Sequence, residues 1–270
     1  MIRKGVIVAA GKGTRLKPIT NAYPKELVPI AGKPVIEYCI DQLKIAGITN
    51  ILIVTGWKKG ALQDYLRDGT SYGVNITYAF QRANKGLPNA IYQAKNFANG
   101  DDFVVINGDN FFKPVSAILN SVEHHDRTRA HVTLTLHGVK DPTKLGVVKL
   151  NKEGEVIKMT EKPTWEEASE YEESGQYFIQ TGCYVLSGKI FEFIEKTPFN
   201  DKGEQFLPKT FELMMESGYK VTSVKHEGIW KDVGTWKDYL YLEQQIMSEA
   251  DIEKMINDRE SQREESDMYD

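Results

Sequence analysis

The stretch Gly5-Val6-Ile7-Val8-Ala9-Ala10-Gly11-Lys12-Gly13-Thr14-Arg15-Leu16 decides the fold of this chain of 270 residues. Residues 5–8 form a short apolar run with β-branched side chains, which predicts the first strand of a buried sheet. The glycine-rich residues 9–16 follow directly. Because glycine has no Cβ, the backbone N–H groups of such a turn can approach a phosphate closely. The segment therefore predicts a buried strand that ends in an anion-binding turn.

Two cations accompany this turn. Arg15 presents a planar guanidinium, and Lys25, within Pro24-Lys25-Glu26-Leu27, adds a point charge. A bare-backbone turn with two cations suits the binding and splitting of a triphosphate. An ordinary strand-to-helix turn with surface cations is the alternative interpretation of so short a motif.

Two familiar phosphate motifs do not fit. The Walker motif requires four residues between its first glycine and Gly-Lys-Ser/Thr, and residues 11–14 lack that spacing. The dinucleotide motif G-x-G-x-x-G requires a third glycine where Leu16 stands, and an acidic residue after the second strand. That strand is expected over residues 51–55, and Gly56 and Trp57 follow it. A dinucleotide-dependent oxidoreductase therefore does not fit the sequence.

The composition is that of an ordinary globular protein, with 41% hydrophobic and 27% charged residues. A formal net charge of -4 argues against general binding of nucleic acid or of an anionic membrane. Cys39 and Cys183 lie in apolar stretches without metal-site spacing, so we expect both to be core residues of a protein from a reducing compartment. The N-terminal segment lacks a signal-peptide pattern and no apolar run reaches transmembrane length, so a soluble cytoplasmic protein is expected.

Strand and helix patterns alternate in the first half of the chain. Pro34 is expected at the first position of a helix that Gly47 closes. This alternation predicts an α/β fold of Rossmann-like type, with a mostly parallel sheet and helices on both faces. The expected elements are a helix over 34–43, a strand over 51–55, a helix over 61–66, a strand over 74–79, a helix over 87–97 and a strand over 103–106.

The second half carries antiparallel signals. The turn Asn151-Lys152-Glu153-Gly154 predicts a hairpin between two of its strands. The charged segment from Glu249 onward indicates a solvated helix or a frayed tail. We therefore expect one domain over 1–240 with a smaller antiparallel part, and a C-terminal helix and charged tail over 241–270. The strands are expected over 131–136, 147–150, 156–159 and 182–186, and the helices over 206–217 and 239–247.

Two aspartates are candidate metal ligands. Asp109 follows the apolar strand at 103–106, and ligands of open α/β sheets bind at the carboxyl ends of the strands. A carboxylate there suits Mg²⁺, which is commonly held by one or two carboxylates together with phosphate oxygens and water. Asp232 is the second candidate. A loop turn around Asp109 and a helix N-cap at Thr235, with Asp232 nearby, are the alternative interpretations.

Weaker candidates follow other strands. Glu161 and Lys162 precede Pro163, which is expected to hold them in extended geometry, where they suit a sugar hydroxyl and a phosphate. An exposed ion pair is the alternative. Gln81 and Gly86-Leu87 lie between a strand and a helix. There the amide of the glutamine could hydrogen-bond to the edge of a nucleotide base, and the backbone of the glycine could approach that base closely.

Together these residues resemble the sugar-1-phosphate nucleotidylyltransferases, or NDP-sugar pyrophosphorylases. The family pattern G-x-G-T-R-L, followed by P-K, stands here at residues 11–16 and at Pro24-Lys25, and the similarity is collinear from about residue 2 to about residue 240. The other matching segments are Gln81, Gly86-Leu87, Gly108-Asp109-Asn110, Leu145-Gly146-Val147-Val148, Glu161-Lys162-Pro163, Thr181-Gly182 and Asp232-Val233-Gly234-Thr235.

The resemblance implies roles for the catalytic candidates. Arg15 would clamp a nucleoside triphosphate and stabilise charge as pyrophosphate leaves, Lys25 would contact the phosphates, and Lys162 would orient the sugar 1-phosphate. Asp109 and Asp232 would hold Mg²⁺.

The resemblance also implies substrate contacts. Gln81 and Gly86 would recognise the base, and Gly146 and Glu161 would face the sugar. The other substrate-binding residues expected are Ala10, Gly11, Gly13, Thr14, Leu87 and Thr181.

The chemistry agrees with a site that has no catalytic histidine or serine. A sugar 1-phosphate oxygen attacks the α-phosphorus in line, and pyrophosphate departs. Because the second pKa of such a phosphate is about 6, the nucleophile is already mostly ionised at neutral pH. Positioning and charge neutralisation then carry the catalysis.

The base and the sugar stay ambiguous. Gly108-Asp109-Asn110 and residues 144–148 resemble thymidylyltransferases acting on glucose 1-phosphate, whereas Pro24-Lys25-Glu26-Leu27 resembles bacterial uridylyltransferases. We favour dTTP over UTP, although the bases differ by only a methyl group. We expect no β-helix extension after residue 240, and this expectation argues against the acetyltransferase-fused uridylyltransferases.

A non-catalytic regulatory subunit that binds nucleotide sugars is an alternative of another class. It would be expected to lose Arg15, Lys25 or the two aspartates, and all four are present. The sequence leaves open whether the protein forms a homo-oligomer.

Overall fold

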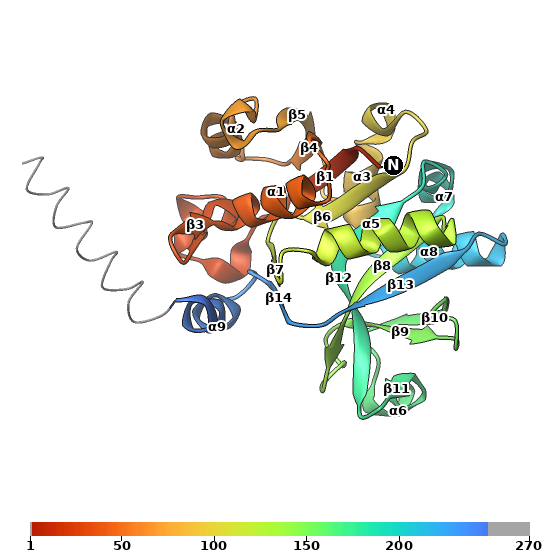
Figure 1. The fold of residues 1–270 in the computed structure, drawn as a ribbon. Helices are drawn as coiled ribbons and strands as arrows, with labels where there is room; N and C mark the ends of the chain where they lie inside the picture. Colours follow the sequence, from red (N-terminus) through yellow and green to blue (C-terminus); the bar gives the residue numbers. More distant parts are fainter. Residues whose placement is uncertain (1, 248–270) are drawn as a thin grey trace, which may run out of the picture.

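The strand β1 (Lys4–Ala9) lies in the middle of a ten-stranded sheet, as its apolar run predicts. The computed structural model describes residues 2–247 (Figure 1). β1 pairs in parallel with β4 on one side and with β6 on the other, and β5 extends the sheet beyond β4. These strands form a parallel core. Their bounds are β4 (Asn50–Thr55), β5 (Asn75–Phe80) and β6 (Phe103–Asn107).

Beyond β6 the sheet becomes largely antiparallel. The long strand β12 (Gln176–Leu186) pairs with β6 through its C-terminal half and with β9 through its N-terminal half. β9 and β10 form the antiparallel hairpin that the turn at 151–154 predicts. The predicted fold class is confirmed, and Figure 1 shows this smaller part beside the parallel core. The strands of this part are β8 (Val132–Val139), β9 (Gly146–Leu150), β10 (Val156–Glu161), β11 (Glu172–Glu173) and β13 (Val221–His226).

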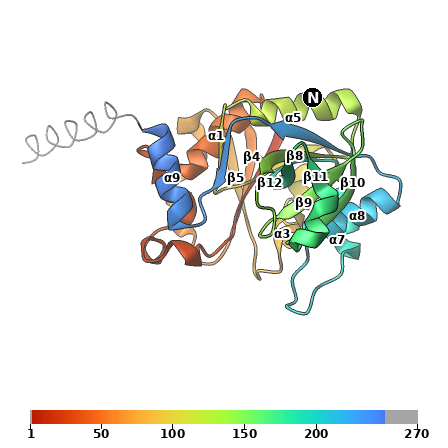
Figure 2. The same cartoon turned by 90° about the horizontal axis from the view of Figure 1, so that it is seen from below.

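Helices cover both faces of the sheet. Within β1, Ile7 packs into the core beneath α1 and α5, and Val6 packs into the opposite core beneath α3, α7 and α8. Figure 2 shows the strands between α5 on one side and α7 and α8 on the other. The helices are α1 (Val35–Ile45), α2 (Gly60–Leu66), α3 (Leu87–Tyr92), α4 (Lys95–Ala98), α5 (Ala117–Thr128), α6 (Trp165–Ala168), α7 (Ile190–Lys196) and α8 (Leu207–Glu216). Within residues 2–247, no helix has the length and apolar character that crossing a membrane requires.

Several local expectations differ from the structure. Pro34 precedes α1 instead of starting it, because its backbone is extended and pairs in a two-residue strand. The helix expected over 87–97 is divided into α3 and α4. The sequence analysis missed α5, because Ser121 and His125 lie on its buried face and hide the apolar period. Those side chains bond to threonines of β8, so the face is polar yet satisfied.

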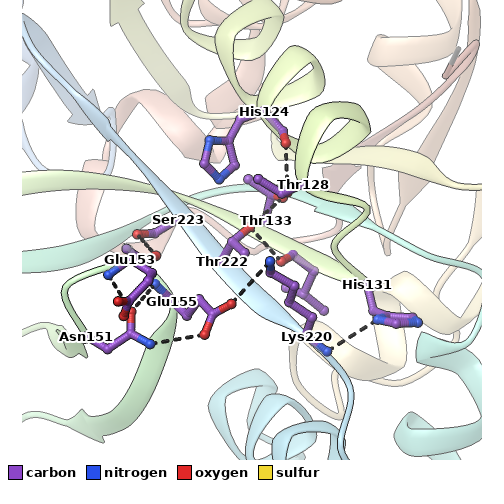
Figure 3. A network of polar contacts seen from close by, with 12 residues as sticks. His124, Thr128, His131, Thr133, Asn151, Glu153, Glu155, Lys220, Thr222 and Ser223 are labelled. Carbon is purple, nitrogen blue, oxygen red and sulfur yellow. Dashed lines mark hydrogen bonds and ion pairs between the residues drawn. The ribbon is translucent and has the colours of Figure 1, made fainter.

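A polar network fixes the β9–β10 hairpin against β13 (Figure 3). Lys220 Nζ lies 3.2 Å from a carboxylate oxygen of Glu155, and Asn151 donates to the other carboxylate oxygen at 3.0 Å. The hydroxyls of Thr133 and Thr222 meet at 3.1 Å across the parallel pair β8–β13. These polar groups serve as hydrogen-bond or ion-pair partners for one another. We therefore infer that the network helps to fix the register of the strands.

A third cluster ties the C-terminal helix α9 (Trp236–Ile246) to the glycine-rich turn. Leu242 packs with Leu16, and Trp236 Nε1 donates to the carbonyl of Lys17 at 2.9 Å. Thr235 caps α9 by accepting from the backbone N–H of Asp238 at 3.2 Å. The remaining strands are β2 (Pro29–Ile30), β3 (Lys33–Pro34), β7 (Asn110–Lys113) and β14 (Ile229–Asp232). The charged segment after Glu249 lies outside the described residues.

Cys39 and Cys183 are both buried free thiols, as expected. Burial raises the pKa of each thiol, which keeps it protonated. Both therefore act as small core residues.

Gly182 is required in a bulge of β12, where the register with β8 shifts. Its φ is 80°, and a Cβ would lie 2.3 Å from Asn107 Nδ2. We expect Gly182→Ala to lower the free energy of unfolding by about 2–4 kcal/mol, from backbone strain and the clash. The matched control Gly218→Ala has a φ of 79° in open space, so it should cost only about 1 kcal/mol. Urea unfolding measures both, and equal losses would contradict the role of the close contact.

Candidate active site

A cavity of about 410 Å³ opens where the parallel core meets the antiparallel part. It lies at the carboxyl end of β6, which is the expected ligand side of an open α/β sheet. Residues from both halves of the chain meet there. The predicted site residues that line it are Gly86, Leu87, Asp109, Gly146, Glu161, Thr181 and Asp232.

The glycine-rich turn lies next to the Lys25 side chain. Gly13, with a φ of 65°, begins a single 3₁₀ turn over Thr14–Leu16. A Cβ at Gly11 would lie 3.3 Å from Lys25 Cε, and one at Gly13 would lie 3.2 Å from Lys25 Cβ. The glycines therefore leave room for the lysine. Gly11 and Gly13 approach Lys25, which bonds to the lining residue Asp109. The cavity lining includes none of the four predicted residues of this turn, which are Ala10, Gly11, Gly13 and Thr14.

Lys25 bonds directly to Asp109. Its Nζ contacts Oδ2 of the buried aspartate. Burial opposes the lysine charge, but nearby carboxylates, chiefly Asp109 and then Glu26, raise the pKa of Lys25 above its usual value. The lysine is therefore an ammonium at neutral pH. It does not line the cavity itself but bonds to Asp109, which does.

Strand pairing brings the second aspartate to the first. Asp232 ends β14 opposite Asn110 of β7, and the next backbone N–H, of Val233, donates to the carbonyl of Asp109 at 2.8 Å. Burial and then the charge of Asp109 raise the pKa of Asp232, while Arg15 and Lys25 oppose the rise. The carboxylates of Asp109 and Asp232 therefore interact electrostatically, and we refer to the two together as the Asp109–Asp232 unit.

Arg15 reaches this unit from the glycine-rich turn. A Cβ at Gly234 would lie 2.9 Å from Arg15 Nη2 and 3.0 Å from Asp232 Oδ2. The guanidinium thus lies over Gly234 beside Asp232. Arg15 is itself exposed, so it is accessible to an anionic ligand.

The sugar-side candidates pair across the β9–β10 hairpin. Gly146 and Glu161 are register partners, and a Cβ at Gly146 would lie 2.8 Å from Glu161 Oε2. Desolvation raises the pKa of Glu161, and the neighbouring charge of Lys162 opposes this rise. The extended geometry expected before Pro163 is wrong for Lys162, which has a left-handed φ of 48°. Its backbone N–H donates to the carbonyl of Leu145 at 3.0 Å, and that bond holds the turn.

Gln81 supports the turn at the other end of the cavity and does not line it. Its Nε2 donates to the carbonyl of Gly86 at 3.2 Å and to Asn89 Oδ1 at 3.0 Å. Gly86 has a φ of 93°, and a Cβ would lie 2.1 Å from the carbonyl oxygen of Gln205. Only glycine fits this contact.

The sequence analysis missed several polar and aromatic residues of the cavity. Asn110 and Trp230 donate to the carbonyl of Thr181, at 2.6 Å and 3.1 Å. The hydroxyl of Thr181 donates to the carbonyl of Thr135 at 2.8 Å, so it is used within the protein. Asn110 Oδ1 is buried without a hydrogen-bond partner among the described residues. The other missed lining residues are Asn107, Lys144, Leu145, Gln180, Gly182, Tyr184, Glu204, Gln205, Phe206, Leu207 and Pro208.

The sequence contained a local indication for only some of these missed lining residues. Asn110 and Leu145 belong to segments that carried the family resemblance, but Trp230 enters the cavity through the pairing of β14 with β7. Sequence periodicity does not encode that pairing.

Comparisons with known proteins agree with this geometry. Residues 4–249 match the family described as nucleotidyl transferase. This chain belongs to the nucleotidyl transferase family. It is 36% identical over 252 residues to a low-salt glycan biosynthesis nucleotidyltransferase of Haloferax volcanii, covering 93% of this chain and 68% of that protein. It is also 30% identical to a UTP–glucose-1-phosphate uridylyltransferase of the same organism, covering 92% of this chain and 98% of that protein.

The fold is similar to that of a Bacillus anthracis protein assigned as a glucose-1-phosphate thymidylyltransferase. The TM-score is 0.79 at 30% identity, over 90% of this chain and 94% of that one. The resemblance found in the sequence is therefore confirmed at the level of the family, and the chain is a nucleotidyltransferase enzyme.

Arg15 provides a test of the site of this nucleotidyl transferase. Arg15→Lys keeps the charge but loses the planar fork, so kcat/KM should fall at least about tenfold. Because the side chain is exposed, the thermal midpoint should change by less than about 2 °C. Arg127→Lys, on the exposed face of α5, is the control. Normal turnover by a strongly destabilised Arg15→Lys protein would make Arg15 a structural residue.

Proposed function

We propose that this enzyme transfers a nucleotidyl group from dTTP to glucose 1-phosphate, releasing pyrophosphate. One observation carries the proposal: a single cavity joins the Asp109–Asp232 unit to the hairpin residues Gly146 and Glu161. The first pair suits a metal-bound triphosphate and the second suits a sugar. The class of relatives, which includes uridylyl- and thymidylyltransferases, supports the same reaction type.

In the proposed reaction the glycine-rich turn and its cations bind the triphosphate. Backbone N–H groups at Gly11 and Gly13 approach the phosphates because no Cβ intervenes. Arg15 and Lys25 supply positive charge where negative charge develops on the departing pyrophosphate. Both cations lie beside carboxylates, which would hold them near the reacting phosphorus.

Asp109 and Asp232 fit a magnesium site that substrate completes. Within residues 2–247 no group of three or more His, Cys, Asp or Glu side chains could hold a metal alone. Mg²⁺ accepts this arrangement, since it is often held by one or two carboxylates with phosphate oxygens and water. Burial and then the charge of Asp109 raise the pKa of Asp232, and the Val233 amide bonds to the Asp109 carbonyl; both observations support a cation held between the two carboxylates. When bound, Mg²⁺ would neutralise phosphate charge and orient the triphosphate.

The sugar side supplies hydrogen-bond acceptors and one cation. Asn110 Oδ1 is buried without a hydrogen-bond partner among residues 2–247, and leaving it so costs free energy, which a sugar hydroxyl would recover. Glu161 is a second acceptor for hydroxyls across the cavity. Lys162, at the end of the same strand, would contact the sugar phosphate.

No general base is required for this step. The attacking phosphate oxygen is already ionised at neutral pH. Among the described residues no histidine lines the cavity. His137 and His226 lie behind Trp230, and burial lowers the pKa of each imidazole. The protein's task is to align the oxygen with the α-phosphorus and the leaving pyrophosphate.

The metal assignment predicts a loss of activity in Asp109→Asn. Removing one carboxylate charge should lower turnover at least about tenfold at saturating Mg²⁺, while far-ultraviolet circular dichroism stays unchanged. Asp126→Asn, on the exposed side of α5, is the matched control. Full activity of Asp109→Asn, or of the unmodified enzyme in excess chelator, would refute the magnesium site.

The substrate assignment is tested by pyrophosphate release with each common nucleoside triphosphate at fixed glucose 1-phosphate. We expect dTTP to be best and UTP to follow within about two orders of magnitude, because one methyl group separates the bases. Purine triphosphates should be poor. A clear preference for ATP or GTP would overturn the choice of base, and no turnover with any sugar 1-phosphate would overturn the proposed reaction.

A further inference from the structure

A buried ion pair lies beside the phosphate-binding lysine and outside the cavity. Glu26, the neighbour of Lys25, is fully buried at 0% exposure, and Lys59 is 6% exposed. Lys59 Nζ lies 2.5 Å from Glu26 Oε2. Neither residue lines the cavity, so the pair makes no direct contact with a ligand there.

The pair connects three loops at the carboxyl edge of the sheet. Glu26 belongs to the loop after β1, and Lys59 ends the loop after β4. A Cβ at Gly108, just before Asp109, would lie 3.2 Å from Glu26 Cγ, so the loop after β6 packs on the glutamate stem. A Cβ at Gly56 would lie 2.7 Å from the Ala10 carbonyl oxygen, which presses the β4 loop against the glycine-rich turn.

Stability alone does not account for these two charges. Removing an ion pair from water costs several kcal/mol per ion, and apolar side chains of similar size are often as stabilising or more so. Glu26 Oε1 has no hydrogen-bond partner among the described residues, so the pair is incompletely satisfied. Lys59 also precedes the first turn of α2, where the helix dipole disfavours a cation.

Which of the two positions carries the negative charge matters for Lys25, the neighbour of Glu26 in the chain. Glu26 directly follows Lys25 in the chain, so its buried carboxylate places a negative charge on the same short loop as Lys25. The ammonium of Lys59, at the end of the loop after β4, reaches that carboxylate from a different part of the chain. An exchange of the two side chains would keep an ion pair but would bring a cation next to Lys25, where like charges repel.

We propose that Glu26 and Lys59 are positioning residues, and that the orientation of their ion pair holds Lys25 in place for the triphosphate. The inference rests on the proposed role of Lys25 as a phosphate ligand. A merely structural pair would need only to be present, whereas a positioning pair must also have its carboxylate on the Lys25 loop.

The experiment compares two double variants with the unmodified enzyme. E26K/K59E exchanges the charges, and E26L/K59M replaces them with apolar side chains of similar size. Thermal melting, calorimetric binding of dTTP without sugar phosphate, and steady-state kinetics are measured for each. We expect E26K/K59E to fold but to lose about tenfold or more in kcat and in dTTP affinity, with the KM for glucose 1-phosphate within about twofold.

The exposed pair Lys95–Glu195 supplies the matched control, since its charges lie 2.7 Å apart between α4 and α7, away from the cavity. K95E/E195K should leave binding and turnover unchanged. Wild-type kinetics and dTTP affinity in E26K/K59E would overturn the proposal.

If E26K/K59E does not fold, E26L/K59M decides, because apolar replacement of a buried pair is usually tolerated. A folded E26L/K59M protein with full activity and dTTP affinity would overturn the proposal. One with about tenfold losses and an unchanged KM for glucose 1-phosphate would support it. Absence of turnover in the unmodified enzyme would count against the proposed function alone, because dTTP binding still reports on the pair.

Discussion

The pairing of β14 with β7 is the constraint on which the site depends. It places Asp232 opposite Asn110 and, through the Val233 amide, against the backbone of Asp109. Burial and then the charge of Asp109 raise the pKa of Asp232, so the two carboxylates repel each other. Main-chain hydrogen bonds hold them together despite this repulsion. The acidic centre of the cavity is therefore fixed by backbone geometry before any ligand arrives.

Cations from a single short segment balance that acidic centre. Arg15 lies beside Asp232, and Lys25 bonds to Asp109, although both aspartates lie far from these cations in the sequence. In a complex with substrate, the negative charge of the triphosphate would take the place of the carboxylates beside the two cations. The positive charge of the metal would take the place of the cations beside the two carboxylates. In the proposed reaction these internal contacts are exchanged for contacts with substrate, so little new organisation is needed.

Close backbone approaches shape the cavity as much as charged side chains do. Gly86 packs on the carbonyl of Gln205, Gly182 packs on Asn107, and Gly234 lies under the Arg15 guanidinium. At each of these positions a Cβ would enter space that is already filled. The hydrogen bonds of Gln81 to Gly86 and of Trp230 to Thr181 then hold the walls at those distances.

The sequence by itself determined the parallel core, the glycine-rich turn with Arg15 and Lys25, and the β9–β10 hairpin, because each follows from residues close together in the chain. Only the tertiary structure decided that Asp232 meets Asp109, that Asn110 and Trp230 share the Thr181 carbonyl, and that Lys59 reaches Glu26. Such contacts depend on strand order and register between distant segments. Local periodicity shows which face of a strand is buried, but not which strand lies beside it.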